Sequence, residues 1–397
     1  MSTTHDPTRH VNYLQQCLSQ DKRSLGVFIA AGCPASISIS SAAGTEPLIP
    51  DVLGLTAFVA DKVRAGPLAP AFAVVEEHLK NDGHKTINVE TQLSFIRGLR
   101  AIGGSGNVRD LAVKDLASLE EEICRYISER VERALPKDEN PYSHMAAWIG
   151  STNRSEPVEV FTTNYDLLSE QALERFRIPY FDGFCGSKNA FLDSHSIDHD
   201  ELPPRWARLW KLHGSINWGL DDANQVFRGT TPINRCIIHP SHLKYDESRR
   251  MPYLAMIDRL RAFIRKSSSV LIVCGYSFRD EHLNACLLES LTGSPKSAVF
   301  GLLHGDLSNY PEAAKISARA GNLSLLARDG AVVGTHRGKW DSRDPGDTGI
   351  WSGAVDLIAD PAGSAGKLAA FRLGDFARLG QFLSALIGRE GAGGYAF

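Results

Sequence analysis

Residues 161–166, Phe-Thr-Thr-Asn-Tyr-Asp, lie where an apolar run ends and polar side chains that can take part in chemistry begin. This pattern is the main indication of the fold. The run that leads into them, Val-Glu-Val-Phe at residues 158–161, has the β-branched and aromatic residues of a buried strand. Two later stretches pass from apolar to polar in the same way: residues 209–215 (Leu-Trp-Lys-Leu-His-Gly-Ser) and residues 270–280 (Val-Leu-Ile-Val-Cys-Gly-Tyr-Ser-Phe-Arg-Asp). Ligands of open α/β sheets bind at the carboxyl ends of the strands. These three ends therefore meet at one pocket only if the sheet is mostly parallel.

Taken together, these stretches resemble the sirtuin-like family of NAD-consuming enzymes. That family reads Thr-x-Asn-x-Asp at one strand end, His-Gly at the next and Gly-x-Ser near a third, which correspond here to residues 162–166, 213–214 and 275–277. Three motifs in the right order are far more specific than any one of them. The stretch Gly-Tyr-Ser-Phe-Arg-Asp-Glu-His at residues 275–282 is most similar to bacterial sirtuin-like NAD hydrolases of antiphage defence, some of which work beside a HerA-type hexameric ATPase.

The resemblance implies an α/β fold with a doubly wound, mostly parallel, Rossmann-like sheet. It implies an enzyme that cleaves NAD, as its substrate, to nicotinamide and ADP-ribose without a metal, and that depletes cellular NAD in antiphage defence. Because such an enzyme left active would drain its own cell, we expect gating by homo-oligomerisation or by a partner such as a HerA-type ATPase. Two other functions stay open: an NAD-dependent protein deacylase, and a catalytically silent nucleotide-binding subunit that regulates a partner ATPase.

The resemblance assigns the chemistry to two residues, Asn164 and His213. Asn164 would hold a water and the ribose hydroxyls, since an amide both donates and accepts hydrogen bonds; its plainer role is that of a strand-end turn former. His213 is the candidate general base because an imidazole titrates near neutral pH, although a lone histidine is more often structural. Asp166 would bind the nicotinamide carboxamide and is equally suited to cap a helix.

The other predicted NAD-binding residues lie in the turns at strand ends. Thr163 belongs with Asn164, while Gly275, Tyr276 and Ser277 would contact the adenosine-side phosphate. The first convincing strand, residues 25–30, runs into Gly32 and Cys33, and small residues at such a turn permit close approach to a phosphate. Asp51 ends an Ile-Pro-Asp element that resembles one lying over the cofactor in the family, with a surface turn as the plainer explanation.

Composition narrows the range of partners. The 397 residues carry 43 basic and 46 acidic side chains, a net charge of −3, so no global field attracts nucleic acid or an anionic membrane. Residues 1–10 are polar, unlike a signal peptide, and no stretch approaches the roughly 18 apolar residues of a membrane span. We therefore expect a cytoplasmic protein.

The cysteines and histidines do not indicate a metal site. Seven cysteines include no Cys-x-x-Cys pair, so neither a disulfide framework nor a zinc ribbon is indicated. This weakens the deacylase alternative, because protein-deacylating sirtuins usually carry a four-cysteine zinc module. His239, His242 and His282 show no metal-ligand spacing, and the charged run at residues 244–250 mixes signs.

The chain is predicted to comprise an N-terminal helical segment (residues 1–24), a sirtuin-like NAD-binding catalytic domain (residues 25–330) and a C-terminal extension (residues 331–397). A helical insertion at about residues 56–150, between the first two strands, should form a lid or wall of the pocket. The remaining predictions are strands at residues 178–181, 298–303 and 323–326, the last closing the sheet; helices at residues 11–19, 167–176, 253–266 and 371–387; loops at residues 337–353 and 361–366; and a flexible tail at residues 391–394.

Overall fold

The computed structural model describes residues 4–41, 44–84, 87–104, 106–151, 154–221, 223, 225–229, 235–237, 252–341, 352–359 and 367–388. Within these residues the main sheet has ten strands: β1 (Thr4–His5), β2 (Leu25–Ile29), β7 (Glu159–Thr162), β8 (Tyr180–Phe181), β11 (Ala207–Lys211), β15 (Val270–Cys274), β16 (Ala298–Leu302), β17 (Leu323–Leu326), β18 (Gly330–Val333) and β19 (His336–Trp340).

The strand order is β1-β19-β18-β17-β16-β15-β2-β7-β11-β8, and every neighbouring pair from β17 to β8 is parallel. The chain builds β7, β8 and β11 on one side of β2 and then returns to build β15, β16 and β17 on the other side. The order thus reverses at β2, which is where the ligand crevice of a doubly wound sheet forms. The predicted α/β class with a mostly parallel, doubly wound sheet is confirmed.

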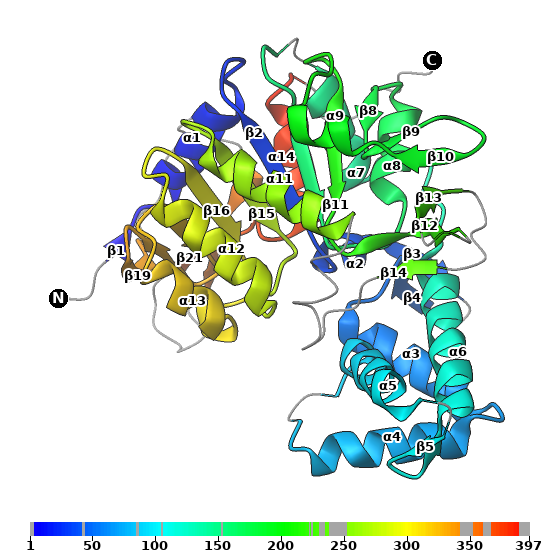
Figure 1. The fold of residues 1–397 in the computed structure, drawn as a ribbon. Helices are drawn as coiled ribbons and strands as arrows, with labels where there is room; N and C mark the ends of the chain where they lie inside the picture. The colour runs from blue at the N-terminus through cyan, green and yellow to red at the C-terminus, as the bar shows by residue number, and fades with distance from the viewer. Residues whose placement is uncertain are drawn as a thin grey trace.

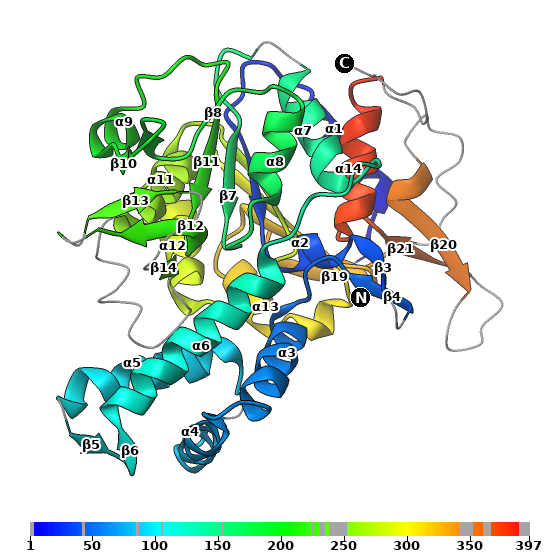
Figure 2. The same ribbon diagram turned by 90° about the vertical axis from the view of Figure 1, so that its right-hand side faces the viewer.

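The helices are α1 (Pro7–Leu18), α2 (Gly32–Ala35), α3 (Val52–Arg64), α4 (Ala69–Asn81), α5 (Val89–Gly103), α6 (Val113–Val131), α7 (Pro141–Gly150), α8 (Leu168–Arg175), α9 (Ser194–His199), α11 (Tyr253–Arg265), α12 (Glu281–Thr292), α13 (Pro311–Ser317) and α14 (Phe376–Ala385). Helices α1, α7, α8 and α14 cover one face of the sheet, and α11, α12 and α13 cover the other (Figures 1 and 2). Among the described residues, every helix is too short or too polar to cross a membrane.

Alternation along the strands explains the two-faced core. In β2, Val27 and Ile29 pack into the core beneath α1 and α7, whereas Phe28 packs into the core beneath α11. β7 repeats the pattern, with Val160 on the first side and Phe161 on the second. Successive strand side chains point to opposite faces, so a strand buried on both faces reads as a continuous apolar run.

A helical module of α3, α4, α5 and α6, with the hairpin of β5 (Asn107–Val108) and β6 (Leu111–Ala112), projects from the carboxyl edge of the sheet (Figures 1 and 2). The hairpin of β3 (Ser38–Ser41) and β4 (Gly44–Pro47) precedes it. α7 lies within the range predicted as the insertion, yet it packs on α8 and α14 against the sheet. Its sequence, Pro-Tyr-Ser-His-Met-Ala-Ala-Trp-Ile-Gly, is apolar on most sides, as burial between other elements requires.

A second, antiparallel sheet is built from strands that lie on both sides of β11 in the sequence. Within the described residues it contains β9 (Phe184–Cys185), β10 (Ala190–Leu192), β12 (Gly214–Leu220), β13 (Val226–Arg228) and β14 (Arg235–Ile237), in the order β14-β12-β13-β10-β9. Because β12 begins at Gly214, His213 stands at the junction of the two sheets. A further hairpin joins β20 (Val355–Ala359) to β21 (Lys367–Phe371).

Three sequence expectations about the last quarter of the chain are wrong. β17 does not close the sheet, since β18, β19 and β1 continue it. Residues 337–340, predicted as the start of a loop, belong to β19 (His336–Trp340). The polar, charged side chains of this strand suit an edge region, where one face meets solvent. The final helix begins at Phe376 rather than residue 371, because residues 367–371 pair as β21.

The predicted boundary after residue 330 falls inside β18. The predictions for residues 244–250, 361–366 and 391–394 lie outside the described residues.

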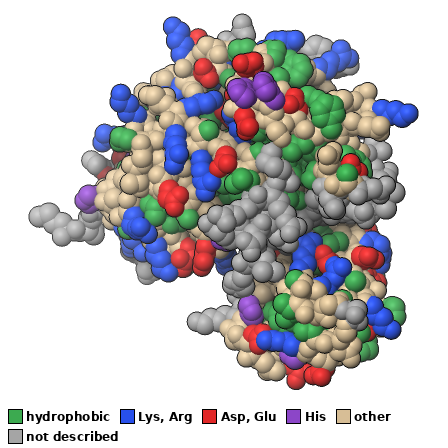
Figure 3. Space-filling model, viewed as in Figure 1, with side chains coloured by type: hydrophobic (Ala, Val, Ile, Leu, Met, Phe, Trp, Pro, Cys, Tyr) green, Lys and Arg blue, Asp and Glu red, His purple; other side chains and the backbone are tan. Residues whose placement is uncertain are grey.

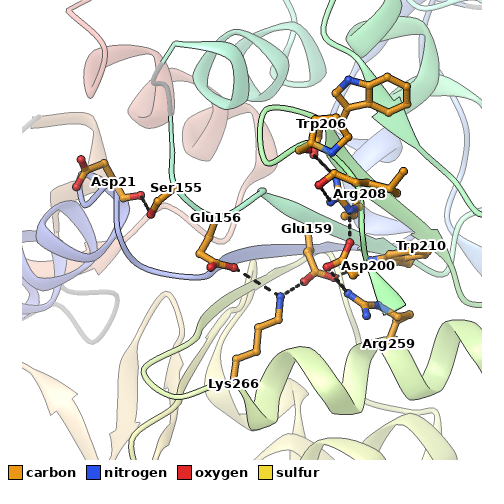
Figure 4. Close-up of polar contacts among 12 residues, drawn as sticks. Asp21, Ser155, Glu156, Glu159, Asp200, Trp206, Arg208, Trp210, Arg259 and Lys266 are labelled. Carbon is orange, nitrogen blue, oxygen red and sulfur yellow. Dashed lines mark hydrogen bonds and ion pairs between the residues drawn. The ribbon is translucent and has the colours of Figure 1, made fainter. Parts of the chain in front are cut away.

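A buried ion cluster ties the amino ends of β7 and β11 to α11, at the edge of the sheet opposite the carboxyl ends of these strands (Figure 4). Glu159 is fully buried and accepts from the Trp210 indole N–H at 2.7 Å and from the Lys266 ammonium at 2.9 Å. The Arg259 guanidinium lies 3.5 Å from Glu159 and 2.9 Å from Asp200. A buried carboxylate requires such partners, because an uncompensated charge is strongly destabilising.

Candidate functional site

A cavity of about 790 Å³ lies between the carboxyl ends of β2, β7, β11 and β15 and the helical module. Its volume is in the range of roughly 300–1,000 Å³ found for ligand pockets. The strand ends and the turns after them supply residues 30–32, 34–36, 163–166, 213, 275–277, 279 and 280 to the lining, and the module supplies residues 51–53, 55, 88–91, 127 and 131. The cavity therefore forms where the strand order reverses, roofed by the helical module.

The structure brings almost all the sequence-predicted site residues to this cavity. Those that line it are Gly32, Asp51, Thr163, Asn164, Asp166, His213, Gly275, Tyr276 and Ser277. Cys33 is not among the lining residues: it is fully buried, and its thiol donates to the Cys274 carbonyl at 3.3 Å. Asp51 caps α3 by accepting from the Gly54 N–H at 2.9 Å.

The turn after β2 differs from the phosphate-binding turn that the sequence predicted. The Gly32 N–H donates to the Gly275 carbonyl at 3.0 Å, and the Cys33 N–H donates to the Ala30 carbonyl at 2.8 Å. Both donors are thus used within the protein. A Cβ on Gly32 would lie 2.8 Å from the Gly275 Cα, so the small residues here let the turns after β2 and β15 touch.

Asn164 is held in one orientation at the carboxyl end of β7. Its side chain is 8% exposed, and its amide Nδ2 donates to the Ala30 carbonyl of the neighbouring strand end at 3.3 Å. Its backbone N–H donates to the Thr162 hydroxyl at 3.0 Å. Behind it lies Tyr142 of α7, fully buried, whose pKa is raised by burial and by the Asp166 carboxylate. The Asn164 amide is therefore fixed beside the cavity by its neighbours.

Asp166 occupies a buried position with a supporting cation beneath it. Its carboxylate accepts from the Leu168 N–H at 3.0 Å, in the turn that leads into α8. Burial raises the pKa of Asp166, and the charge of Lys211 opposes that rise. The buried Lys211 ammonium donates to the Asp166 carbonyl and, at 2.9 Å, to the Glu170 carboxylate. Asp166 thus both shapes the turn and presents its side chain to the cavity.

His213 pairs with a carboxylate that sequence reasoning did not assign a role. The His213 Nε2 lies 3.2 Å from the Asp280 Oδ2, and the two side chains are 9% and 8% exposed. Asp280 is the N-cap of α12, where its Oδ1 accepts from the His282 N–H at 3.0 Å and from the Leu283 N–H at 3.2 Å. The only sequence signal for Asp280 was its place in the stretch 275–282.

Arg279, in the same stretch 275–282 as Asp280, is the only lysine or arginine among the described residues that line the cavity. Other lining residues carry no sequence signal that points to the site. Glu90 and Asn88 enter from the start of α5, and residues 302, 304, 309, 310 and 374–376 enter from the end of β16, the segment after it and the C-terminal part. These positions lie far from the three strand ends in sequence, so only the folded chain brings them together.

Metal binding finds no support in the described residues, where no group of three or more His, Cys, Asp or Glu side chains is placed to hold an ion. His239 and His242 lie outside that part of the chain. His282 is the second residue of α12, and its backbone N–H donates to the capping carboxylate of Asp280.

Residues 158–320 match a protein-family model described as a SIR2-like domain. The match covers less than half of the chain, but it includes β7, β11 and β15 and therefore the strand ends that carry Asn164, His213 and Ser277. The match thus covers the ends of β7, β11 and β15 but not the turn after β2, which also lines the cavity.

Solved structures of Sir2 proteins are also similar to the chain. One is Sir2 with the inhibitor EX-527, 2′-O-acetyl-ADP-ribose and a deacetylated p53 peptide, at 13% identity over 73% of this chain and 86% of that chain, with a TM-score of 0.33. Another is a Sir2 mutant with a p53 peptide and NAD, at 15% identity over 74% of this chain and 86% of that chain, also with a TM-score of 0.33. No curated protein matches the chain.

Proposed function

We propose that this protein cleaves NAD at the bond between nicotinamide and ribose, releasing nicotinamide and ADP-ribose. The observation that carries the proposal is the convergence of Asn164, Asp166 and His213, from the ends of two adjacent parallel strands, on one cavity with Ser277 from a third. The similarity of residues 158–320 to a SIR2-like domain supports the same substrate.

The chemistry requires little beyond what the cavity offers. The nicotinamide of NAD leaves already activated by its positive charge, and the ribose passes through a sugar cation, as in glycoside hydrolysis. The enzyme must orient the two halves of the substrate, limit the access of water and position one water or ribose hydroxyl. A cavity closed by a strand edge on one side and helices on the other suits that task.

Each residue then has a part in the proposal. The fixed Asn164 amide holds the attacking water and the ribose hydroxyls, since it can donate and accept at once. His213 accepts the proton that the water or hydroxyl releases. Asp166 binds the nicotinamide carboxamide, and Arg279, the cation among the described lining residues, faces the negative charge of the pyrophosphate.

Incubation of the purified protein with NAD tests the proposal, with nicotinamide and ADP-ribose measured with and without an acylated peptide. We expect the two products in equal amounts whether or not the peptide is present. Nicotinamide release that requires the peptide, with formation of an acylated ADP-ribose, would indicate a protein deacylase instead. No release under any condition, even with a candidate ATPase added, would indicate a binding subunit.

We further propose that the activity is gated, and that it serves antiphage defence by depleting cellular NAD. The proposal rests on the resemblance of residues 275–282 to bacterial NAD hydrolases of that kind and on the cost to a cell of an unregulated NAD hydrolase. The gate would be a homo-oligomer or a HerA-type hexameric ATPase. The helical module, which roofs the cavity and stands out from the sheet, is the part best placed to transmit such a contact (Figure 2).

A further inference from the structure

We propose that Asp280 is a positioning residue that orients His213 and stabilises its protonated form, so that the two side chains act as a histidine–aspartate pair. The inference rests on the proposed function, in which His213 is the general base. It goes beyond that function by assigning a second residue to the proton transfer. Its support is the geometry of the contact and the way in which Asp280 itself is held.

The two oxygens of Asp280 have separate partners. Oδ1 accepts both N–H groups at the start of α12, from His282 at 3.0 Å and Leu283 at 3.2 Å. Oδ2 lies 3.2 Å from the His213 Nε2. A helix cap needs only one acceptor oxygen, which serine and threonine also supply. The carboxylate therefore offers a second oxygen to the imidazole, a contact that a cap alone does not explain.

The position of the pair makes the contact effective. Both side chains are less than 10% exposed, so the contact is screened less than it would be on the surface. The α12 cap fixes the carboxylate, and the junction between β11 and β12 fixes the backbone of His213. The Asp280 carboxylate is thus held beside the His213 imidazole before any proton transfer takes place.

The contact also places a carboxylate where the proton transfer creates positive charge. In the proposed reaction the His213 imidazole takes the proton from the water or ribose hydroxyl as that oxygen bonds to the ribose carbon and nicotinamide leaves with the electrons of the glycosidic bond. The imidazolium formed in this step is stabilised by the Asp280 carboxylate beside it.

Other charged and titratable groups share the cavity with the pair and contribute to its field. Those among the described lining residues are Asp51, Glu90, Tyr165, Asp166, Tyr276, Arg279, His304, Tyr310 and Asp375. Tyr165 lies close enough to both Glu90 and Asp280 for these carboxylates, after burial, to raise its pKa. Because the surroundings stay the same when Asp280 alone is changed, a comparison of wild type with a single variant isolates its effect.

The test uses Asp280→Asn in the full chain, since asparagine caps a helix as well as aspartate and removes only the charge. Asp6→Asn is the matched control: Asp6 caps α1 by accepting from the Thr8 N–H at 2.9 Å, and it does not line the cavity. Three quantities are measured for each protein: nicotinamide release across pH, the titration of the His213 ring followed by NMR, and thermal unfolding. The His213 signal is identified by its absence from His213→Gln.

We expect Asp280→Asn to melt close to wild type while kcat falls at least about tenfold, up to the ~10⁴-fold that loss of a general base can cost. Removal of the neighbouring negative charge disfavours the imidazolium, so the His213 titration and the acid limb of kcat/KM should both move to lower pH. Asp6→Asn should change neither. If Asp280→Asn does not fold, Asp280→Ser, which also caps, replaces it.

Two results would overturn the inference. An unchanged His213 titration in the variant would show that Asp280 does not act on the imidazole, whatever the activity. A shifted titration with an unchanged rate would show a contact that the reaction does not use. Wild-type protein that releases no nicotinamide would instead count against the proposed function, and the NMR titration would still decide whether the pair exists.

Discussion

At the scale of single residues, the turn that brings Asp166 to the cavity is held by Lys211, a buried cation. Its side chain is about 1% exposed and its ammonium lies 2.9 Å from the Glu170 carboxylate, which is 9% exposed. The same ammonium donates to the Asp166 carbonyl. Burial raises the pKa of Glu170, and Lys211 opposes the rise. Lys211 therefore favours the charged form of Glu170 against the cost of its burial.

Lys211→Met should destabilise the protein by about 3–5 kcal/mol at neutral pH, because it leaves Glu170 buried and unpaired. A carboxyl whose folded pKa lies above its unfolded value loses stability as pH rises through the folded pKa. The deficit should therefore shrink as the pH is lowered and Glu170 becomes protonated. Denaturant unfolding at neutral and acidic pH measures this. Lys211→Met combined with Glu170→Gln should recover part of the loss, and a deficit independent of pH would contradict the account.

The residues that sequence could predict are those next to strand ends. Asn164 and His213 follow apolar runs directly, so their place at the carboxyl edge follows from strand geometry. Asp280 and Glu90 could not be assigned a role in this way, since their place at the cavity depends on how α12 and α5 are oriented. Cys33 also follows a strand, but it lies in the four-residue helix α2, which directs its thiol into the core rather than the cavity.

At the scale of elements, the site is assembled by two turns that touch, the one after β2 and the one after β15. Gly275 has a φ of +69°, and a Cβ there would lie 2.7 Å from the Cys33 backbone nitrogen. Gly32 meets Gly275 from the other side. The two strand ends that would frame the substrate are thus set at a fixed separation by glycine on both sides.

Gly275→Ala should destabilise the protein through two causes: about 1–3 kcal/mol from backbone strain and a similar amount from the overlap. Gly83→Ala is the matched control, since Gly83 has a φ of +81° with nothing within 4 Å of an added Cβ. It should show only the strain. Thermal unfolding and nicotinamide release of both variants check this. Equal losses of stability in Gly275→Ala and Gly83→Ala would show that the turns after β2 and β15 are not packed closely enough to exclude a Cβ.

The central strands and most helices could be predicted from apolar runs and helical spacing, because both patterns reflect burial. β7, β11 and β15 are examples. β19 could not be predicted in this way, because its exposed arginine and lysine side chains interrupt any apolar run. Its one buried residue, Trp340, donates its indole N–H to the Ala327 carbonyl at 2.8 Å, a tertiary contact that the local sequence does not indicate. The bounds of α14 depended in the same way on the pairing of β21 with β20.

At the scale of the whole molecule, the helical module and the doubly wound sheet enclose the cavity from two sides. Sequence predicted a helical insertion between β2 and β7 that forms a lid or wall of the pocket, because helical stripes interrupt the strand pattern there. In the structure α3, α5 and α6 contribute residues to the cavity lining. On the described residues of the face drawn in Figure 3, acidic and basic side chains are interspersed. That mixture of signs agrees with the net charge of −3.

If the activity is gated by assembly, one of two results is expected. Either light scattering of the purified protein shows an oligomer, or its rate of NAD cleavage rises when a HerA-type ATPase is added. Oligomerisation of the active form should make the specific activity depend on protein concentration, because association follows mass action. A strictly monomeric protein that is fully active without any partner would contradict gating and leave the chemistry of the site untouched.

The most direct test of the central claim is nicotinamide release from NAD, measured beside thermal unfolding, for Asn164→Ala and His213→Ala. His195→Ala and Asn81→Ala, at exposed positions outside the cavity lining, serve as controls. We predict that each site variant melts near wild type and loses about 10²–10⁴-fold in rate, and that the double variant loses far less than the product, since both residues serve one step. A normally melting His213→Ala that keeps near-full activity would contradict the assignment of the base.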